Sequence, residues 1–377
     1  MAKAVRAVHF NRTVTTGLTQ WLCDAKFKRM LVAESKAARA EADSLNDPNR
    51  SWKKITGHVE PFLHAVGEQL SRQVNDFDPQ IVPYAQYALN GNGKHLRPTL
   101  VALSANAVGK VSDAHVTAAV IIEMVHLATL VHDDVMDEAE IRRGRPTLAE
   151  NWGNEIAVLF GDCLFAQALK LAASFPTPEV CRAVAMATNT VCTGEILQTQ
   201  HRRNFQLSRR EYFRVIEMKT AELFTLSCEL AAFLGGAMPE HRAALRQFGT
   251  AFGTAYQVYD DCLDLFGTES EAGKSLGTDL AKGKLTWPML LAWERADAID
   301  REHLEHLIQN WQPGHFSTVN DFLIKYGTLE PSLEMVENFL EQARGALHTL
   351  PASEGRESLF GLTQFLTQQT GALAVCI

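Results

Sequence analysis

Polar side chains interrupt an otherwise apolar stretch at residues 123–147, whose sequence is EMVHLATLVHDDVMDEAEIRRGRPT. On a helix of about 3.6 residues per turn, the polar members follow one side: Glu123, His126, Thr129, Asp133 and Asp137. The last two are one turn apart, so their carboxylates lie on one face with Asp134 beside them. Like charges this close repel each other unless a cation lies between them, and Mg²⁺ prefers such oxygen ligands. The stretch therefore predicts a Mg²⁺ site on a buried helix.

The same D-D-x-x-D spacing occurs again in YQVYDDCLDLF at residues 256–266. Its carboxylates, Asp260, Asp261 and Asp264, also lie within an apolar helical pattern, and Gln257 lies one turn earlier. A single acidic cluster near a helix end is commonly solvated surface. Two clusters inside apolar helices instead predict acidic helix ends that face each other and hold several divalent ions against a diphosphate.

Basic residues flank the first acidic motif on both sides. Arg142 and Arg143 follow it, and a guanidinium group matches phosphate oxygens in pairs. Upstream, GNGKHLRP at residues 91–98 is a glycine turn that leads into a helix. Backbone N–H groups at such a helix start, with Lys94 and Arg97 beside them, form an anion site. Taken alone, this segment is more typical of a loop with two solvated bases.

The motifs resemble, in order and spacing, those of the trans-type polyprenyl diphosphate synthases, most of all the long-chain, octaprenyl-type members. The resemblance covers about residues 60–371. It rests on G-K-x-L-R-P at 93–98, E-x-x-H at 123–126, H-D-D-x-x-D at 132–137, R-R-G-x-P-T at 142–147, G-E-x-x-Q at 194–198, K-T at 219–220, Q-x-x-D-D-x-L-D at 257–264 and G-K-x-x-G-x-D…G-K at 273–284.

The resemblance implies an enzyme that condenses isopentenyl diphosphate with an allylic diphosphate, head to tail and in trans. It implies three Mg²⁺ ions with substrate bound, and metal ligands at Asp133, Asp137, Asp260, Asp261 and Asp264. The catalytic set that it implies is Asp133, Asp134, Asp137, Lys219, Thr220, Gln257 and Asp260.

The resemblance also divides the substrate-binding residues between two diphosphates. It assigns the diphosphate of isopentenyl diphosphate to Lys94, Arg97, His126 and Arg143. It assigns the allylic diphosphate to Arg142, Lys219, Lys274 and Lys284. It places the Thr220 hydroxyl and the Gln257 carbonyl near the developing carbocation, where oriented dipoles are effective.

The expected fold class is all-α, because no sustained period-two alternation occurs after residue 60. Helices are expected at 60–74, 79–90, 97–108, 113–138, 154–174, 178–203, 209–234, 239–266 and 285–296, with shorter ones beyond. We expect a single-domain bundle of the isoprenoid synthase type at residues 56–377, with a central substrate cavity. Residues 1–55 are expected to be a helical, partly mobile N-terminal extension; an organellar transit peptide is the weaker alternative.

The bulk properties narrow the partners and the compartment. A formal net charge of −8 argues against nucleic acid. No segment is expected to reach the apolar length of a transmembrane helix, so at most peripheral membrane contact for product release is expected. Seven scattered cysteines without a C-x-x-C pair predict a reduced, cytoplasmic protein. A homodimer is expected from the resemblance alone.

The helix before the first aspartates is expected to set the product length. Ala128 and Thr129, one turn upstream of Asp133, are small, whereas Met124 and Val125, a turn deeper, are modest obstacles. One helical turn of about 5.4 Å is close to the reach of one isoprene unit. A product longer than geranylgeranyl is therefore predicted.

Two alternatives remain open. A terpene cyclase or a head-to-head condensing enzyme shares the fold and the acidic motifs, but it lacks an isopentenyl diphosphate site such as GKHLRP and RRGRPT. A catalytically silent regulatory subunit of a heteromeric synthase is expected to have lost an aspartate motif, and this chain keeps both. One departure from many relatives is the C-terminus, which ends GALAVCI without a basic tail.

Overall fold

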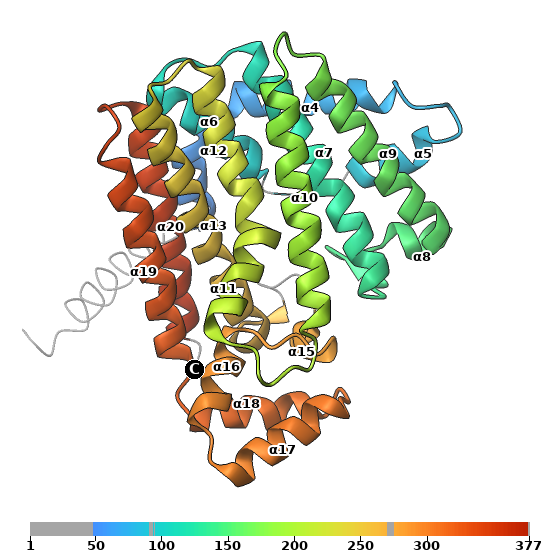
Figure 1. Cartoon of the computed structure of the whole chain (residues 1–377), viewed down its shortest axis with the longest axis vertical. Coiled ribbons are helices and arrows are strands. Elements are labelled where there is room, and N and C mark those ends of the chain that lie inside the picture. Colours follow the sequence, from blue (N-terminus) through green and yellow to red (C-terminus); the bar gives the residue numbers. More distant parts are fainter. Residues whose placement is uncertain (1–47, 90–92, 94, 270–274, 376–377) are drawn as a thin grey trace, which may run out of the picture. The chain divides into compact units, whose positions relative to one another are not determined.

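The computed structural model describes residues 48–89, 93, 95–269 and 275–375 (Figure 1). Lys94, Lys274 and most of the expected N-terminal extension lie outside the described residues. The chain divides into two units after Lys54, and the second unit, Ile55–Ile377, contains both aspartate motifs.

The expected all-α class is confirmed. The first half contains α3 (Pro48–Thr56), a 3₁₀ turn (Gly57–Val59), α4 (Glu60–Val74), α5 (Val82–Leu89), α6 (Leu96–Val108), α7 (Asp113–Met136), α8 (Leu148–Trp152), α9 (Asn154–Ala173) and α10 (Glu179–Gln200). The second half contains α11 (Arg209–Ile216), a π-helical turn (Glu217–Ala221), α12 (Glu222–Leu234), α13 (Pro239–Phe266), α15 (Thr278–Ala281), α16 (Trp287–Arg295), α17 (Ala298–Gln309), α18 (His315–Lys325), α19 (Leu329–Leu347) and α20 (Glu354–Val375).

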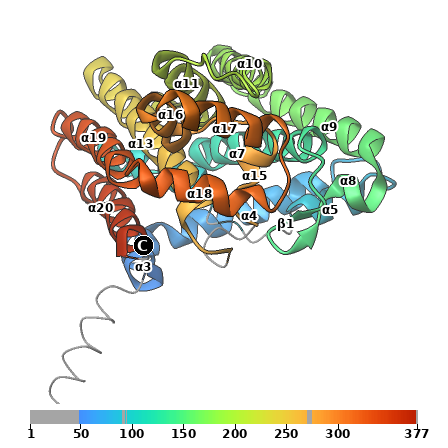
Figure 2. The same cartoon turned by 90° about the horizontal axis from the view of Figure 1, so that it is seen from below.

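Helix α7 forms the centre of the bundle. It begins with a capping box, in which the Ser112 backbone N–H donates to His115 Nδ1 and the Ser112 side chain accepts from the backbone of the first turn. Most of its residues are apolar, so every side of the helix needs a partner, and α7 packs against α4, α6, α9 and α12. The view along the bundle shows α7 surrounded by other helices (Figure 2). The prediction that this helix lies inside the protein is confirmed.

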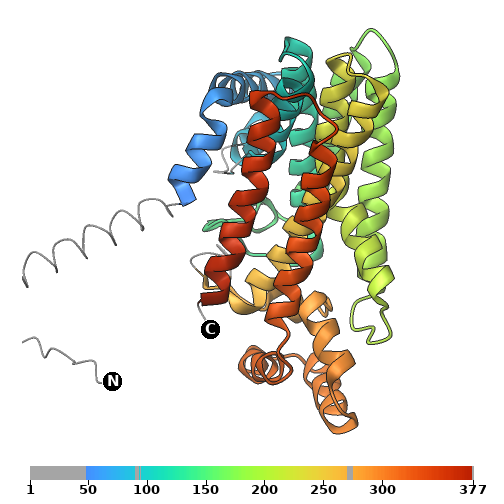
Figure 3. The same cartoon turned by 90° about the vertical axis from the view of Figure 1, so that its left-hand side faces the viewer.

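Helix α13 carries the second aspartate motif. Pro239 lies in its first turn, where a missing N–H costs nothing, and the helix continues to Phe266. It packs against α12 on one side and α19 on another. Helices α19 and α20 run side by side at the edge of the bundle (Figure 3). Both acidic motifs therefore lie on long helices, α7 and α13, which packing against the neighbouring helices holds in place.

A small hairpin follows the first aspartate motif and was not expected from the sequence. Its strands are β1 (Ile141–Arg142) and β2 (Arg145–Pro146), which pair antiparallel. Arg143 and Gly144, between the strands, have φ angles of 52° and 72°. Two consecutive positive φ angles are typical of a tight hairpin turn whose twist matches the strands. The hairpin turns Arg142 and Arg143 back beside α7.

Two helices, α7 and α9, are long and apolar enough to cross a membrane by length and composition alone. The expectation that no segment reaches this length was therefore wrong. The apolar window of α7 is 61% buried, which is consistent with a central bundle helix, and that of α9 is 39% buried. Apolar side chains of α9 thus remain exposed on the bundle surface.

Candidate active site

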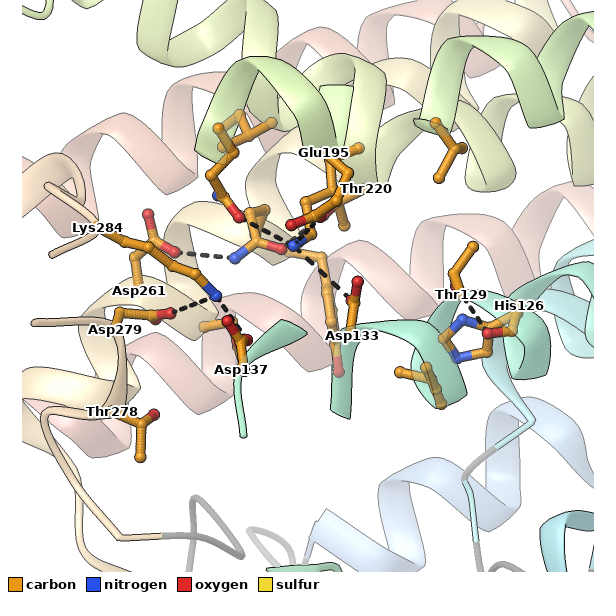
Figure 4. Close-up of a pocket in the computed structure, with 18 of the residues that line it drawn as sticks. His126, Thr129, Asp133, Asp137, Glu195, Thr220, Asp261, Thr278, Asp279 and Lys284 are labelled. Carbon is orange, nitrogen blue, oxygen red and sulfur yellow. Dashed lines mark hydrogen bonds and ion pairs between the residues drawn. The ribbon is translucent and has the colours of Figure 1, made fainter. Parts of the chain in front are cut away.

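A cavity of about 1490 Å³ lies between α6, α7, α10, α12, α13 and α20 (Figure 4). The first motif contributes Asp133, Asp134 and Asp137 to its wall, and the second contributes Asp260 and Asp261. Two segments more than one hundred residues apart in sequence thus bring their carboxylates into one space, as the repeated spacing predicted. Among the described residues, no three metal-binding side chains already converge on one point.

Asp133 lies opposite a lysine. Lys219 Nζ is 3.7 Å from Asp133 Oδ2, donates to Gln198 Oε1 at 2.9 Å and forms a close ion pair with Glu195. Burial, with smaller contributions from Glu195 and Asp137, raises the pKa of Asp133 to about 6, although Lys219 and Lys284 oppose the shift. A carboxylate whose charge is this costly to bury is well placed to gain from a divalent cation.

The lysine is carried by the π-helical turn between α11 and α12. Such turns are rare and occur frequently at functional sites. The turn packs against α10 at Gly194, where an added Cβ would lie 2.6 Å from the backbone nitrogen of Lys219. A side chain at this position would push the two helices apart. Gly194 therefore allows the close approach that places Lys219 beside Asp133.

Asp137 bonds to two basic side chains. Lys284 Nζ donates to Oδ2 at 2.8 Å, and Arg202 Nη2 donates to Oδ1 at 2.9 Å. Burial alone would raise the pKa of Asp137, but Lys284, Lys219 and Arg202 together lower it. Asp137 is consequently an ionised group that holds positive charge at the acidic end of the cavity.

Asp134, the middle residue of the first motif, accepts a hydrogen bond from Arg142 Nε at 2.7 Å. Burial raises its pKa, although Arg142 opposes the shift. The pair fixes the hairpin arginine against α7. The structure thus gives Asp134 the role of orienting Arg142, and its direct part in catalysis stays a prediction.

A chain of hydrogen bonds connects the second motif to the π-helical turn. The Thr220 hydroxyl donates to Gln257 Oε1 at 2.7 Å, and Gln257 Nε2 donates to Asp261 Oδ1 at 2.8 Å. The Tyr212 hydroxyl donates to the other oxygen of Asp261. Burial raises the pKa of Asp261 to about 8, with Asp279 and Asp260 adding to the shift. Both carboxylate oxygens of Asp261 are therefore bonded to protein donors.

Asp264 is buried and is not among the described residues that line the cavity. It accepts hydrogen bonds from the Thr278 hydroxyl at 2.8 Å and from the backbone N–H of Asp279 at 3.2 Å. These bonds hold the segment that leads to Lys284 against α13. Its role as a metal ligand stays a prediction.

The opposite end of the cavity is basic. Arg97, His126 and Arg143 all line it, and the Arg97 guanidinium lies 4.8 Å from the centre of the Phe224 ring. Burial, together with Arg97, Arg143 and Arg142, lowers the pKa of His126 well below its usual range. His126 is therefore neutral and can donate or accept a hydrogen bond without adding charge.

The glycine turn meets this basic end at Gly93. A Cβ added to Gly93 would lie 2.9 Å from Arg143 Nη1, so the turn and the hairpin arginine are in close contact. His95 Nδ1 lies 3.5 Å from Glu123 Oε1, and this hydrogen-bonding contact raises the pKa of His95. The described residues of the segment predicted to bind an anion, among them Gly93 and Arg97, thus lie with Arg143 at this end of the cavity.

Of the four residues expected to set product length, only Thr129 is among the described residues that line the cavity. Ala128, Met124 and Val125 are fully or almost fully buried in contacts between helices. The cavity wall at this depth is instead completed by Leu130, Phe165, Val191 and Cys192. Ala128 is completely buried, so its influence on product length stays a prediction, and Thr129 is the residue of the four that lines the cavity directly.

Several residues of the site were not identified from the sequence as functional. Glu195 and Gln198 contact Lys219, and the G-E-x-x-Q segment was a signal for them. Arg202 and Tyr212 contact the aspartates from segments distant in sequence, and no local pattern marks them. Asp279, the aspartate of the G-K-x-x-G-x-D motif, donates through its backbone N–H to Asp264 and forms an ion pair with Lys284.

Comparison with known proteins identifies the family. A profile of the polyprenyl synthetase family matches residues 78–322. The chain belongs to the polyprenyl synthetase family. The chain is 34% identical to the octaprenyl diphosphate synthase of Escherichia coli (strain K12) over 318 residues. The matched region covers 84% of this chain and 98% of that protein.

Solved structures give the same result for this polyprenyl synthetase. A decaprenyl diphosphate synthase from Rhodobacter capsulatus has a TM-score of 0.80 at 33% identity, with 85% of this chain and 99% of that chain covered. A polyprenyl synthase from Caulobacter crescentus CB15, complexed with calcium and isoprenyl diphosphate, has a TM-score of 0.80 at 32% identity, with 84% and 97% covered. The expected isoprenoid synthase fold and prenyl-transferring enzyme class are confirmed.

Proposed function

We propose that the protein is a Mg²⁺-dependent synthase that condenses isopentenyl diphosphate with an allylic diphosphate, head to tail and in trans, to give a long-chain polyprenyl diphosphate. The observation that carries the proposal is that two aspartate motifs and a set of buried bases line one cavity. The named relatives, an octaprenyl and a decaprenyl synthase, support the long-chain product.

The donor set fits Mg²⁺. Asp133, Asp137 and Asp260 offer hard oxygen ligands from two helices, and burial makes the uncompensated charge of Asp133 costly. With three ions bound, Mg²⁺ would neutralise the leaving diphosphate and weaken its C–O bond. Lys219 lies beside Asp133, Lys284 beside Asp137 and Arg142 beside the neighbouring Asp134, so each would contact a diphosphate held there. Lys274 is proposed for the same role.

Isopentenyl diphosphate would bind at the basic end of the cavity. Arg97 and Arg143 supply charge, neutral His126 supplies a hydrogen bond, and Lys94 is proposed to join them. The basic end of the cavity disfavours a terpene cyclase, because such an enzyme needs no second diphosphate site. The presence of both aspartate motifs in the cavity likewise disfavours a silent regulatory subunit.

Between the two ends, the Thr220 and Gln257 oxygens would stabilise the allylic carbocation. Apolar side chains of the wall, among them Leu130 and Phe165, would exclude water that quenches such a cation. The motifs contain no obvious base, so the released diphosphate is proposed to accept the final proton. The product tail would extend past Thr129.

A homodimer is proposed from an exposed apolar surface on neighbouring helices. Large apolar side chains on α8, α9 and α10 remain open to solvent: Trp152, Val158, Leu159, Leu169, Met186 and Ile196. Such a surface is typical of an interface. Leu159→Glu changes the most exposed of the large apolar side chains on α9 and is expected to shift the protein toward monomer in light scattering, and an unchanged dimer would contradict this interface.

A cytoplasmic location is also proposed. The described cysteines, Cys163, Cys181, Cys192, Cys228 and Cys262, are all free thiols, as expected in a reducing compartment. Peripheral contact with a membrane would suffice for release of an apolar product. Microscopy of the full chain with a C-terminal fluorescent tag checks the location.

The decisive experiment is incubation with Mg²⁺, labelled isopentenyl diphosphate and either farnesyl or geranylgeranyl diphosphate, followed by chromatography of the dephosphorylated products. Products longer than twenty carbons are expected. Products of twenty carbons or fewer would contradict the proposed length, and no incorporation would favour the silent subunit. Omission of Mg²⁺ is expected to abolish incorporation.

A further inference from the structure

Tyr212 is a buried tyrosine that none of the family motifs includes. It lies on α11, lines the cavity, and is 4% exposed. Its ring stacks on Trp287 with centroids 5.7 Å apart, and its hydroxyl donates to Asp261. The aromatic contacts fix the ring, so the hydroxyl has one defined partner within the second aspartate motif.

Asp261, held by Tyr212, in turn orients the side-chain amide of Gln257. Its Oδ2 accepts from Tyr212 and its Oδ1 accepts from Gln257 Nε2 at 2.8 Å. The hydrogen bonds from Tyr212 and Gln257 favour the ionised form of Asp261, because they lower its pKa. An ionised carboxylate only accepts hydrogen bonds, so it selects the N–H₂ end of the amide. The amide oxygen is thereby turned toward Thr220, from which it accepts at 2.7 Å.

The orientation of this amide matters because its two ends have opposite polarity. The carbonyl oxygen is negative and the N–H₂ group is positive. If the amide were reversed, Nε2 could still donate to the Thr220 oxygen, so Thr220 by itself does not choose between the two orientations. The choice therefore depends on Asp261, and Asp261 is held by Tyr212.

We propose that Tyr212 and Asp261 are positioning residues that fix the Gln257 amide with its oxygen toward the reacting carbon. This inference rests on the proposed function, because it assumes that a carbocation forms beside Thr220 and Gln257. It also revises the prediction that Asp261 ligates metal, because its side chain is buried and both oxygens accept from Tyr212 and Gln257. Asp137 is likewise bonded at both oxygens, but its side chain is 24% exposed. Asp260, the neighbour of Asp261, remains the proposed ligand.

The test is Tyr212→Phe, which removes one hydroxyl and keeps the ring. We expect kcat to fall about tenfold, while KM for both diphosphates stays within about twofold. The matched control is Tyr326→Phe, which removes a tyrosine hydroxyl that donates to Asp300 on α17, outside the cavity. Its kcat is expected to equal that of the wild type. Equal kcat in Tyr212→Phe and the wild type would overturn the proposal.

A binding measurement separates positioning from general structural damage. The probes are an ammonium analogue of the allylic cation, added with inorganic diphosphate and Mg²⁺, and its neutral carbon isostere. Tyr212→Phe is expected to weaken the ammonium analogue about tenfold and to leave the isostere unchanged. Equal weakening of both would overturn the proposal. A wild type that does not prefer the ammonium analogue would instead contradict the proposed role of Thr220 and Gln257.

A measurement of metal binding tests the revised role of Asp261. Binding of Mn²⁺ in the presence of inorganic diphosphate, measured by electron paramagnetic resonance, is expected to be unchanged in Tyr212→Phe and Asp261→Asn. It is expected to weaken in Asp260→Asn. A loss of Mn²⁺ in Asp261→Asn as large as that in Asp260→Asn would show that Asp261 is a ligand and overturn the inference. If Asp261→Asn does not fold, Tyr212→Phe alone decides.

Discussion

Lys219 and Asp133 face each other in the cavity, with Nζ 3.7 Å from Oδ2, although they come from the π-helical turn and from α7. Glu195 and Gln198 hold the same ammonium group. The lysine is thus positioned by three partners before any ligand binds. Such preorganised charge contributes to catalysis because little reorganisation remains at the moment of reaction.

Lys219→Met should therefore lower kcat by about 10²-fold to 10³-fold, the usual effect of removing one preorganised donor. Steady-state kinetics with the allylic substrate measure the change. Lys325→Met, which removes the exposed partner of Asp300, is the control and should leave kcat unchanged. A loss of less than threefold in Lys219→Met would show that the lysine does not contact the reacting diphosphate.

Gly194→Ala should displace the π-helical turn, because the new Cβ would lie 2.6 Å from a backbone nitrogen. Overpacking of this kind costs about 1–3 kcal/mol of unfolding free energy. Gly345→Ala in α19 meets nothing within 4 Å and should instead stabilise by about 0.4–1 kcal/mol. Urea denaturation of both variants measures the difference in unfolding free energy. Equal values would mean that α10 shifts to accommodate the added methyl group without a loss of stability.

The stability of the protein should fall in mild acid because of His115. Burial lowers the pKa of this histidine below 6.5; its Nε2 bonds to the Ala231 carbonyl and its Nδ1 accepts from Ser112. The unfolded chain therefore takes up the proton first. The contribution is complete above about pH 6.5 and is lost as the pH falls through the lower, folded pKa, by at most about 1.4 kcal/mol per pH unit.

His115→Gln isolates this effect. Urea denaturation at pH 5 and pH 7.5 should show a smaller loss of stability in acid for the variant than for the wild type. An identical pH dependence in the two proteins would mean that His115 titrates at its ordinary pKa in the folded state. The difference between the pH dependences of the two proteins isolates the contribution of His115, because every other titrating group is present in both.

Thr129→Phe should shorten the products, because the Thr129 side chain lines the cavity where the tail would pass. Ala128→Phe should instead lower stability, since Ala128 is completely buried in helix packing. Chromatography of the products and thermal denaturation distinguish the two variants. Shortened products from a stable Ala128→Phe protein would show that Ala128 also influences product length.

Helix positions followed from the sequence wherever apolar spacing and punctuation agreed. Pro239 and Gly267 bracket α13, whose observed bounds match the predicted ones. The segment 209–234 was predicted as one helix, whereas a π-helical turn divides it. The surplus residue shifts the phase of the later apolar positions, but no proline or glycine within 209–234 marks the shift, so the segment was predicted as one helix.

The acidic ends of the site were predictable because each is a local pattern on one helix. Their partners were not. Arg202 reaches Asp137, and Tyr212 reaches Asp261, only after α10 and α11 have packed against the central helices. The burial of Ala128 was not predictable, because helical spacing gives the face of a side chain but not the neighbour that covers it.

The π-helical turn at Glu217–Ala221 implies a constraint on length rather than on composition. One surplus residue rotates all later side chains by roughly 100° relative to a regular helix. Removing a single residue there would swing Tyr212 and the apolar face of α12 out of phase with each other. Outside Lys219, Thr220 and the buried Ala221, this segment should consequently tolerate substitutions during evolution but almost no deletions.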